Sequence, residues 1–170
     1  RHTRLRTVTG VQTCALPIYF ERGKEAGREV AAQGVRFVFR KEMTPHSQYT
    51  PGEVDCLLVN TTGELKHFYD QAEVIFVGKS LTAEGGQSPI EPGALGKPIV
   101  FGPHMQNFQA VARAFVEQQG ARQVANADEL EAAIASLLAD PDQAAAMGRR
   151  ALAVVRENQG SIERTVDMLV

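Results

Sequence analysis

Two short segments carry a hydroxyl and a carboxylate side chain in the same spacing. Thr61 precedes Glu64 by three positions, and Ser88 precedes Glu91 by three positions. This is the spacing of a capping box, in which both side chains satisfy free amide groups at the start of a helix. It also suits a ligand site, because the first N–H groups of a helix attract phosphate, while a carboxylate can accept hydrogen bonds from ribose hydroxyls. The spacing leaves both interpretations open.

Glycine and proline are concentrated between the same segments. Residues 78–103 hold six of the 15 glycines and four of the eight prolines. Loops of this composition allow the backbone to approach a ligand closely. Lys79 is either a partner for a phosphate or a solvated loop lysine, and Asn107 is either a helix cap or a polar ligand. The exposed loop is the default interpretation for His104.

The elements that position these residues alternate between apolar runs and helical patterns. We expect five strands, at residues 35–39, 55–60, 74–78, 98–102 and 121–125. We expect helices at residues 20–33, 63–72, 107–119, 127–139, 142–158 and about 161–169. Continuous apolar strands that alternate with helices predict an α/β fold, a Rossmann-like parallel sheet with helices on both faces. Since ligands bind at the carboxyl ends of such strands, we expect the two hydroxyl–carboxylate segments to face one cleft.

Composition excludes several classes of protein. The chain has 170 residues, with 18 Lys and Arg against 20 Asp and Glu, so no strong basic field exists for a nucleic acid. No apolar run is long enough to cross a bilayer. Two cysteines exclude a disulfide framework and a zinc site. No metal or cofactor is expected, and no catalytic triad, Walker loop or GxGxxG motif occurs in residues 19–170.

The first 18 residues differ from the remainder. They carry three Arg and no acidic residue, and their apolar residues follow neither helical nor strand spacing. We expect residues 1–18 to be a foreign tail produced by sequence assembly; a natural tail and a targeting peptide are the alternatives. We therefore expect one domain at residues 19–170.

A series of motifs runs through the second part of the chain. They are TGEL at 62–65, FVGKSL at 76–81, GGQSPIEP at 85–92, ALGKP at 94–98, GPH at 102–104, NF at 107–108 and NQG at 158–160. In this order they resemble the C-terminal half of the 3-deoxy-D-manno-octulosonic acid (Kdo) transferases, inverting glycosyltransferases of the GT-B fold that use CMP-Kdo. The resemblance covers about residues 57–170.

The resemblance implies that residues 19–170 form a nucleotide-sugar donor-binding domain and that these motifs contact the donor nucleotide. The candidate donor-binding residues are Thr62, Gly63, Glu64, Lys79, Ser80, Gly85, Gly86, Gln87, Ser88, Glu91 and Asn107. Many family members have Asn in place of Ser88 and often Gly in place of Lys79. The family's Pro-Arg pair is absent ahead of Tyr19, so we expect a phosphate-binding Arg to be missing.

The resemblance also implies a function for the parent enzyme. That enzyme would transfer Kdo to a lipid A precursor in lipopolysaccharide biosynthesis, at the cytoplasmic side of the bacterial inner membrane. The family's acceptor domain, catalytic Glu and membrane anchor would lie outside this chain, which would then bind CMP-Kdo without catalysing transfer. Two alternatives remain: a GT-B domain for a UDP- or ADP-sugar, and a non-catalytic α/β binding module.

Overall fold

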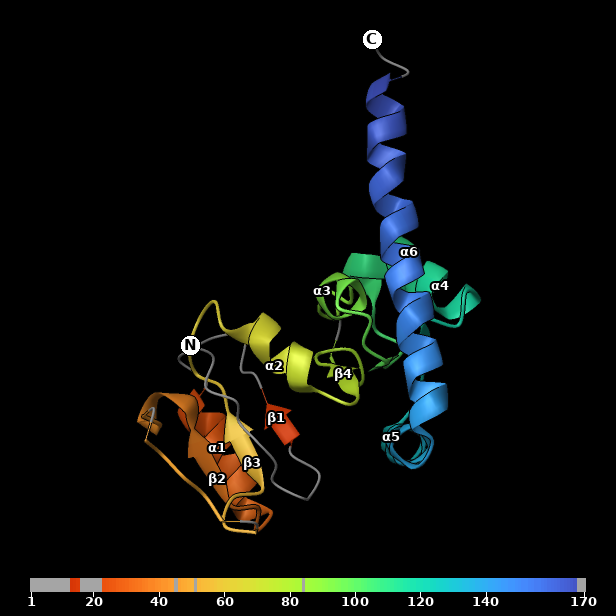
Figure 1. Ribbon diagram of the computed structural model, residues 1–170. Helices are drawn as coiled ribbons and strands as arrows, with labels where there is room; N and C mark the ends of the chain where they lie inside the picture. Colours follow the sequence, from red (N-terminus) through yellow and green to blue (C-terminus); the bar gives the residue numbers. More distant parts are fainter. Residues whose placement is uncertain (1–12, 16–22, 45, 51, 84, 168–170) are drawn as a thin grey trace. The chain divides into compact units, whose positions relative to one another are not determined.

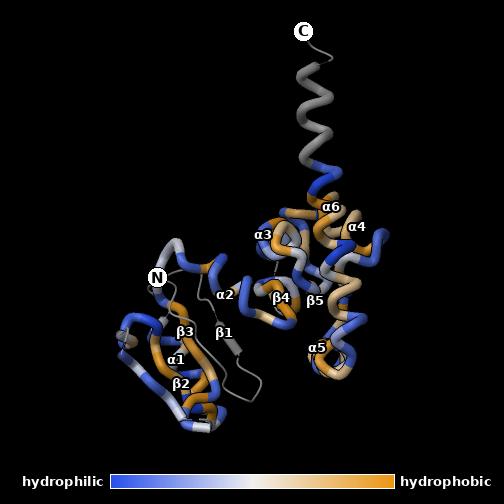
Figure 2. The backbone as a smooth tube through the Cα atoms, in the orientation of Figure 1, coloured by the Kyte–Doolittle hydropathy of each residue, from blue (hydrophilic) through white to orange (hydrophobic). Residues whose placement is uncertain are grey.

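The computed structural model describes residues 13–15, 23–44, 46–50, 52–83 and 85–167. The chain divides into two compact units, Arg1–Leu65 and Lys66–Val170, each with its own three-stranded sheet (Figure 1). All strand pairs are parallel. The strands predicted from apolar runs are all present, and Figure 2 shows the hydrophobic stretches along β3 and β4.

The first unit has the strand order β1-β3-β2. Its elements are β1 (Thr13–Ala15), α1 (Gly23–Ala32), β2 (Phe37–Phe39), a 3-10 turn (Arg40–Glu42) and β3 (Cys56–Leu58). β1 lies inside the segment that we expected to be a foreign tail, and it pairs with β3; most of that segment lies outside the described residues. The residue before β2, Arg36, forms a two-pronged ion pair with Asp55, at 2.7 and 2.6 Å.

α1 approaches β2 very closely. The rings of Phe37 and Phe39 stand edge to face with centroids 5.2 Å apart. A Cβ atom at Gly27 would lie 2.9 Å from the ring of Phe39, so only glycine allows this packing distance. The left-handed Gly34, at φ +73°, follows the helix and ends it as the sequence predicts.

The second unit has the strand order β4-β5-β6. Its elements are α2 (Leu65–Gln71, which begins at the last residue of the first unit), β4 (Ile75–Val77), α3 (Ile90–Ala94), β5 (Ile99–Phe101), a 3-10 turn (Gln106–Phe108), α4 (Gln109–Glu117), β6 (Ala121–Gln123), α5 (Ala127–Ala139) and α6 (Pro141–Asp167). The described helices include none that is long and apolar enough to cross a membrane.

The central strand β5 is buried on both faces. Ile99 and Phe101 belong to a core cluster with side chains of α4 and α6, whereas Val100 belongs to a second cluster with side chains of α5 and α6. All three residues have no exposed surface. Within the second unit, the predicted sheet with helices on both faces is therefore confirmed.

The starts of α5 and α6 follow local capping, whereas the end of α6 differs from the prediction. The Asn126 side chain accepts a hydrogen bond from the Glu129 N–H, and α5 runs over the predicted residues. The Asp140 carboxylate accepts one from the Gln143 N–H, and α6 begins at Pro141. We predicted a break near Gly160, but α6 continues to Asp167. A glycine inside a helix costs only about 1 kcal/mol, which is too little to end it.

Candidate functional site

The loops that follow β4 and β5 are joined through Ser80. Its hydroxyl donates a hydrogen bond to the Val77 carbonyl oxygen at 2.5 Å and accepts one from the Gly102 N–H at 2.8 Å. The Ser80 carbonyl oxygen accepts another from the His104 N–H at 2.8 Å. Because the Ser80 side chain is fully buried, this predicted donor-binding residue holds two loops together and does not present its hydroxyl to solvent.

A glycine turn joins the same loops a second time. The Gly85 N–H donates to Gln106 Oε1 at 3.0 Å, and the Gly85 carbonyl oxygen accepts from the Asn107 N–H at 3.2 Å. The Gly86 N–H donates to the Lys79 carbonyl oxygen at 3.1 Å. Gly85 has φ +105° and Gly86 φ +63°, and a Cβ at Gly85 would lie 2.7 Å from Asn107 Nδ2. Both positions therefore require glycine.

Lys79 occupies a left-handed backbone conformation at the carboxyl end of β4. Its φ is +57°, which is unusual for a residue with a side chain. The side chain is exposed, and its ammonium group contacts no acidic partner among the described residues. Backbone strain of this kind costs on the order of 1 kcal/mol and is concentrated at functional sites. The exposed Lys79 ammonium group is thus placed near the end of β4 at a cost in backbone strain.

The segment 87–91 does not form the predicted capping box. α3 has only five residues, Pro89 is its N-cap, and its first residue is Ile90. The Ser88 hydroxyl accepts a hydrogen bond from the Ile90 N–H at 3.3 Å. The exposed Glu91 carboxylate makes no hydrogen bond to the residues that the structure describes. Because the helix starts one residue later than predicted, Glu91 is not at the capping position, and its carboxylate faces solvent.

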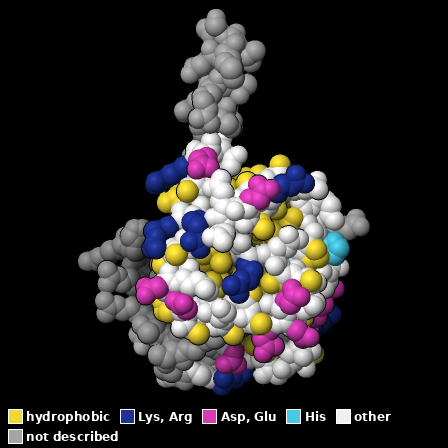
Figure 3. Space-filling model, turned by 90° about the vertical axis from the view of Figure 1, so that its right-hand side faces the viewer, with side chains coloured by type: hydrophobic (Ala, Val, Ile, Leu, Met, Phe, Trp, Pro, Cys, Tyr) yellow, Lys and Arg dark blue, Asp and Glu magenta, His cyan; other side chains and the backbone are white. Residues whose placement is uncertain are grey.

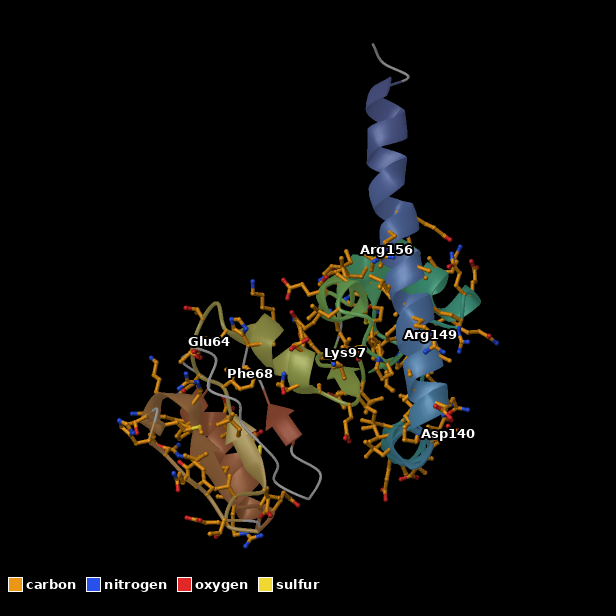
Figure 4. The ribbon with its side chains drawn as sticks, in the orientation of Figure 1. Glu64, Phe68, Lys97, Asp140, Arg149 and Arg156 are labelled. Atoms are coloured by element: carbon orange, nitrogen blue, oxygen red, sulfur yellow. The ribbon has the colours of Figure 1, made fainter. Side chains whose placement is uncertain are left out.

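In the first unit, Glu64 lies just before α2, as Figure 4 shows. The Thr61 hydroxyl donates to Glu64 Oε2 at 2.5 Å, and Arg40 Nη2 lies 2.8 Å from Glu64 Oε1. Both charged side chains keep about a third of their surface exposed, at 32% for Arg40 and 34% for Glu64. The predicted capping box is wrong here too, because the helix begins at Leu65, after Glu64. Thr62 and the left-handed Gly63 are exposed beside this ion pair.

Sequence reasoning missed Arg40 and Gln106. Arg40 follows the last residue of β2, so its position at the carboxyl end of a predicted strand was a usable signal. Its partner Glu64 is 24 residues away, which no local pattern indicates. Gln106 lies 21 residues from Gly85 and carries no motif of its own. Such long-range partners follow from the fold alone.

A hollow of about 460 Å³ lies beside the joined loops. Phe101, Met105 and Ala112 form its apolar lining, and Gln106, Gln109 and Arg113 contribute polar side chains. The lining extends from the end of β5 along α4 to Gln123, the last residue of β6, so the hollow lies at the edge of the sheet where α/β proteins bind ligands. None of the predicted site residues lines this hollow.

The predicted site residues fall into two groups. Lys79, Ser80, Gly85, Gly86, Gln87, Ser88, Glu91 and Asn107 belong to the second unit, and Thr62, Gly63 and Glu64 belong to the first. The described residues include no cluster of His, Cys, Asp and Glu that suits a metal ion. Lys, Arg, Asp and Glu are interspersed on the face shown in Figure 3. This mixed surface differs from the one-sign basic patch typical of nucleic-acid binders.

Comparisons with known proteins give consistent matches. The family model of the glycosyl transferases group 1 matches residues 49–154. A 3-deoxy-D-manno-octulosonic acid transferase of Haemophilus influenzae is 37% identical over 66% of this chain and 27% of its own length. One from Bordetella pertussis is 33% identical over 91% of this chain and 35% of its own length. The chain thus spans about a third of the length of these curated relatives.

A solved structure matches the fold. The C-terminal CMP-Kdo binding domain of WaaA from Acinetobacter baumannii superimposes with a TM-score of 0.75 at 25% sequence identity. The match covers 84% of this chain and 72% of the solved one. The predicted fold class and the predicted resemblance to the Kdo transferases are confirmed by these matches.

Proposed function

The chain belongs to the glycosyl transferases group 1 family, and on this premise we propose that it is the part of a Kdo transferase that binds the donor CMP-Kdo. The observation that carries the proposal is the structural match to a CMP-Kdo binding domain over 84% of the chain. Sequence similarity to Kdo transferases over up to 91% of the chain supports the same assignment.

Donor recognition is assigned to the joined loops of the second unit. CMP-Kdo carries an anionic phosphodiester and an anionic carboxylate, so a cation near the nucleotide favours binding. Lys79 supplies that cation, and the glycine turn at Gly85 and Gly86 allows the backbone to approach the donor. The exposed Glu91 carboxylate has the acceptor oxygens that ribose hydroxyls need, and Asn107 offers an amide beside the turn.

In the first unit, Glu64 and its neighbours are proposed to bind donor hydroxyl groups. The ion pair with Arg40 and the hydrogen bond from Thr61 hold the Glu64 carboxylate in one orientation. An oriented carboxylate loses less conformational entropy when it binds a ligand. Thr62 and Gly63 add exposed backbone groups next to it. The Glu64 carboxylate oxygens can accept hydrogen bonds that the hydroxyl groups of a ribose donate.

For the whole enzyme we propose transfer of Kdo to a lipid A precursor, with inversion, at the cytoplasmic side of the inner membrane. An acceptor hydroxyl attacks the anomeric carbon of Kdo, and its proton passes to a base supplied by a segment other than this chain. The bond between that carbon and the phosphate oxygen breaks, and CMP leaves as a phosphate monoester. The departing phosphate gains negative charge, so the Lys79 ammonium stabilises the transition state more than the ground state.

Calorimetric titration of the 170-residue chain with CMP, UDP and GDP tests the proposal. We expect the chain to bind CMP more tightly than UDP or GDP. We expect Glu91→Gln to weaken CMP binding about tenfold, because a hydrogen bond to a charged group is lost. Glu131→Gln is the matched control, since Glu131 is an exposed α5 carboxylate. A preference for UDP would indicate another sugar-nucleotide transferase, and equal weak binding of all three nucleotides would overturn the donor assignment.

A further inference from the structure

The conformation of the glycine turn depends on contacts with the loop that follows β5. Gly85 and Gly86 both have positive φ, and glycine is the residue with the largest conformational freedom to lose. One of the bonds that fix the turn, Gly86 N–H to the Lys79 carbonyl oxygen, is internal to the loop. The turn therefore depends on the 102–108 loop for its external support.

That support includes the close packing of Gly86 against Met105 and the His104 carbonyl oxygen, and two hydrogen bonds to Gly85. The first joins its carbonyl oxygen to the Asn107 N–H at 3.2 Å, and the second joins its N–H to Gln106 Oε1 at 3.0 Å. Gly85 is buried, so an N–H without this partner would lose a hydrogen bond that water replaces poorly. Only the second bond uses a side chain, and Gln106 itself is exposed. The Gln106 side chain can therefore be replaced without disturbing the buried core.

We infer that Gln106 is a positioning residue, which holds the Gly85–Gly86 turn in the conformation that receives the donor. The inference rests on the proposed function and deepens it. Gln106 acts through the turn, because its acceptor oxygen is already used by the Gly85 N–H. Without that bond the turn samples other conformations, and the donor must select the bound one from them. The apparent affinity for the donor is then the intrinsic affinity multiplied by the fraction of molecules whose turn has the bound conformation.

The test compares three variants of the full chain. Gln106→Leu keeps the approximate size of the side chain and removes the acceptor, whereas Gln106→Glu keeps an acceptor oxygen. Gln109→Leu is the matched control, because Gln109 is an exposed glutamine of the same surface, three residues further along. Hydrogen exchange of the peptide that contains residues 85–86 reports on the turn without any ligand, and CMP titration reports on affinity.

We expect Gln106→Leu to speed exchange at the turn and to weaken CMP binding about tenfold, which corresponds to about 1.4 kcal/mol. Gln106→Glu should restore slow exchange, and Gln109→Leu should change neither measurement. Wild-type exchange in Gln106→Leu, or faster exchange with unchanged CMP affinity, would overturn the inference. If the wild-type chain does not bind CMP while Gln106→Leu still speeds exchange, the proposed function fails and the positioning of the turn stands. Equal unfolding midpoints of all variants show that the fold is retained.

Discussion

Replacing Ser80 by alanine tests whether this residue is a structural link or a ligand contact. The substitution removes the acceptor of the buried Gly102 N–H and the donor to the Val77 carbonyl oxygen. A buried polar group left without a partner costs about 1–3 kcal/mol. Since the Ser80 side chain has no exposed surface, water cannot easily replace either bond. We expect Ser80→Ala to lower the free energy of unfolding by about 2–3 kcal/mol.

Urea unfolding of the full chain measures this loss. With an m-value of about 2 kcal/mol per M, the unfolding midpoint should fall by about 1–1.5 M. Ser88→Ala is the control, because the Ser88 hydroxyl accepts a longer, solvent-exposed bond from Ile90 at 3.3 Å; its effect should stay within about 0.5 kcal/mol. If Ser80→Ala keeps wild-type stability and loses CMP binding, Ser80 is a ligand contact and our assignment of it as a structural link is refuted.

Three further predictions concern charged residues. Lys79→Gly should raise the free energy of unfolding by about 0.5–1 kcal/mol because the left-handed strain is relieved, while weakening CMP binding most at low salt; a loss of stability in urea unfolding would contradict this. Arg40→Met should cost less than about 1 kcal/mol but weaken CMP binding by releasing the Glu64 carboxylate, and unchanged affinity in calorimetry would count against that role. The hydrogen bonds from the Arg36 side chain and N–H lower the pKa of Asp55, so its contribution to stability is present at neutral pH and is lost as pH falls below about 4, through the lowered pKa. Asp55→Asn should therefore lower the urea midpoint slightly at pH 7 and narrow its difference from wild type in acid, and a difference independent of pH would disprove the assignment.

The elements of the fold were predictable because their signals are local. The strands are continuous apolar runs, and β5 is the clearest example because it is buried on both faces. The start of α5 at Ala127 follows from the Asn126 cap, and the start of α6 follows from Asp140 and Pro141. These signals depend on a few neighbouring residues, so they can be interpreted without knowing the tertiary structure.

The site was less predictable because its contacts are long-range. The hydroxyl–carboxylate spacing indicated capping, yet Glu64 is bound by Arg40 from 24 residues away. From the sequence, Ser80 appeared to be a polar loop residue. Its neighbours in the chain cannot show that it is buried against Gly102, the residue that follows β5. Gln106 became visible only when its side chain was seen to contact Gly85. The sequence pattern pointed to these loops but did not distinguish the residues that hold them together from those that are exposed to solvent.

α6 contributes to both layers of the second unit, and this has a consequence for synthesis of the protein. Its residues Ala144 and Met147 complete one core cluster, and Ala151, Val154 and Val155 complete the other. While the chain is being translated, the sheet formed by β4, β5 and β6 has incomplete cover on both sides until these late residues emerge from the ribosome. We expect the nascent unit to expose apolar surface until then, and transiently exposed surface of this kind favours aggregation.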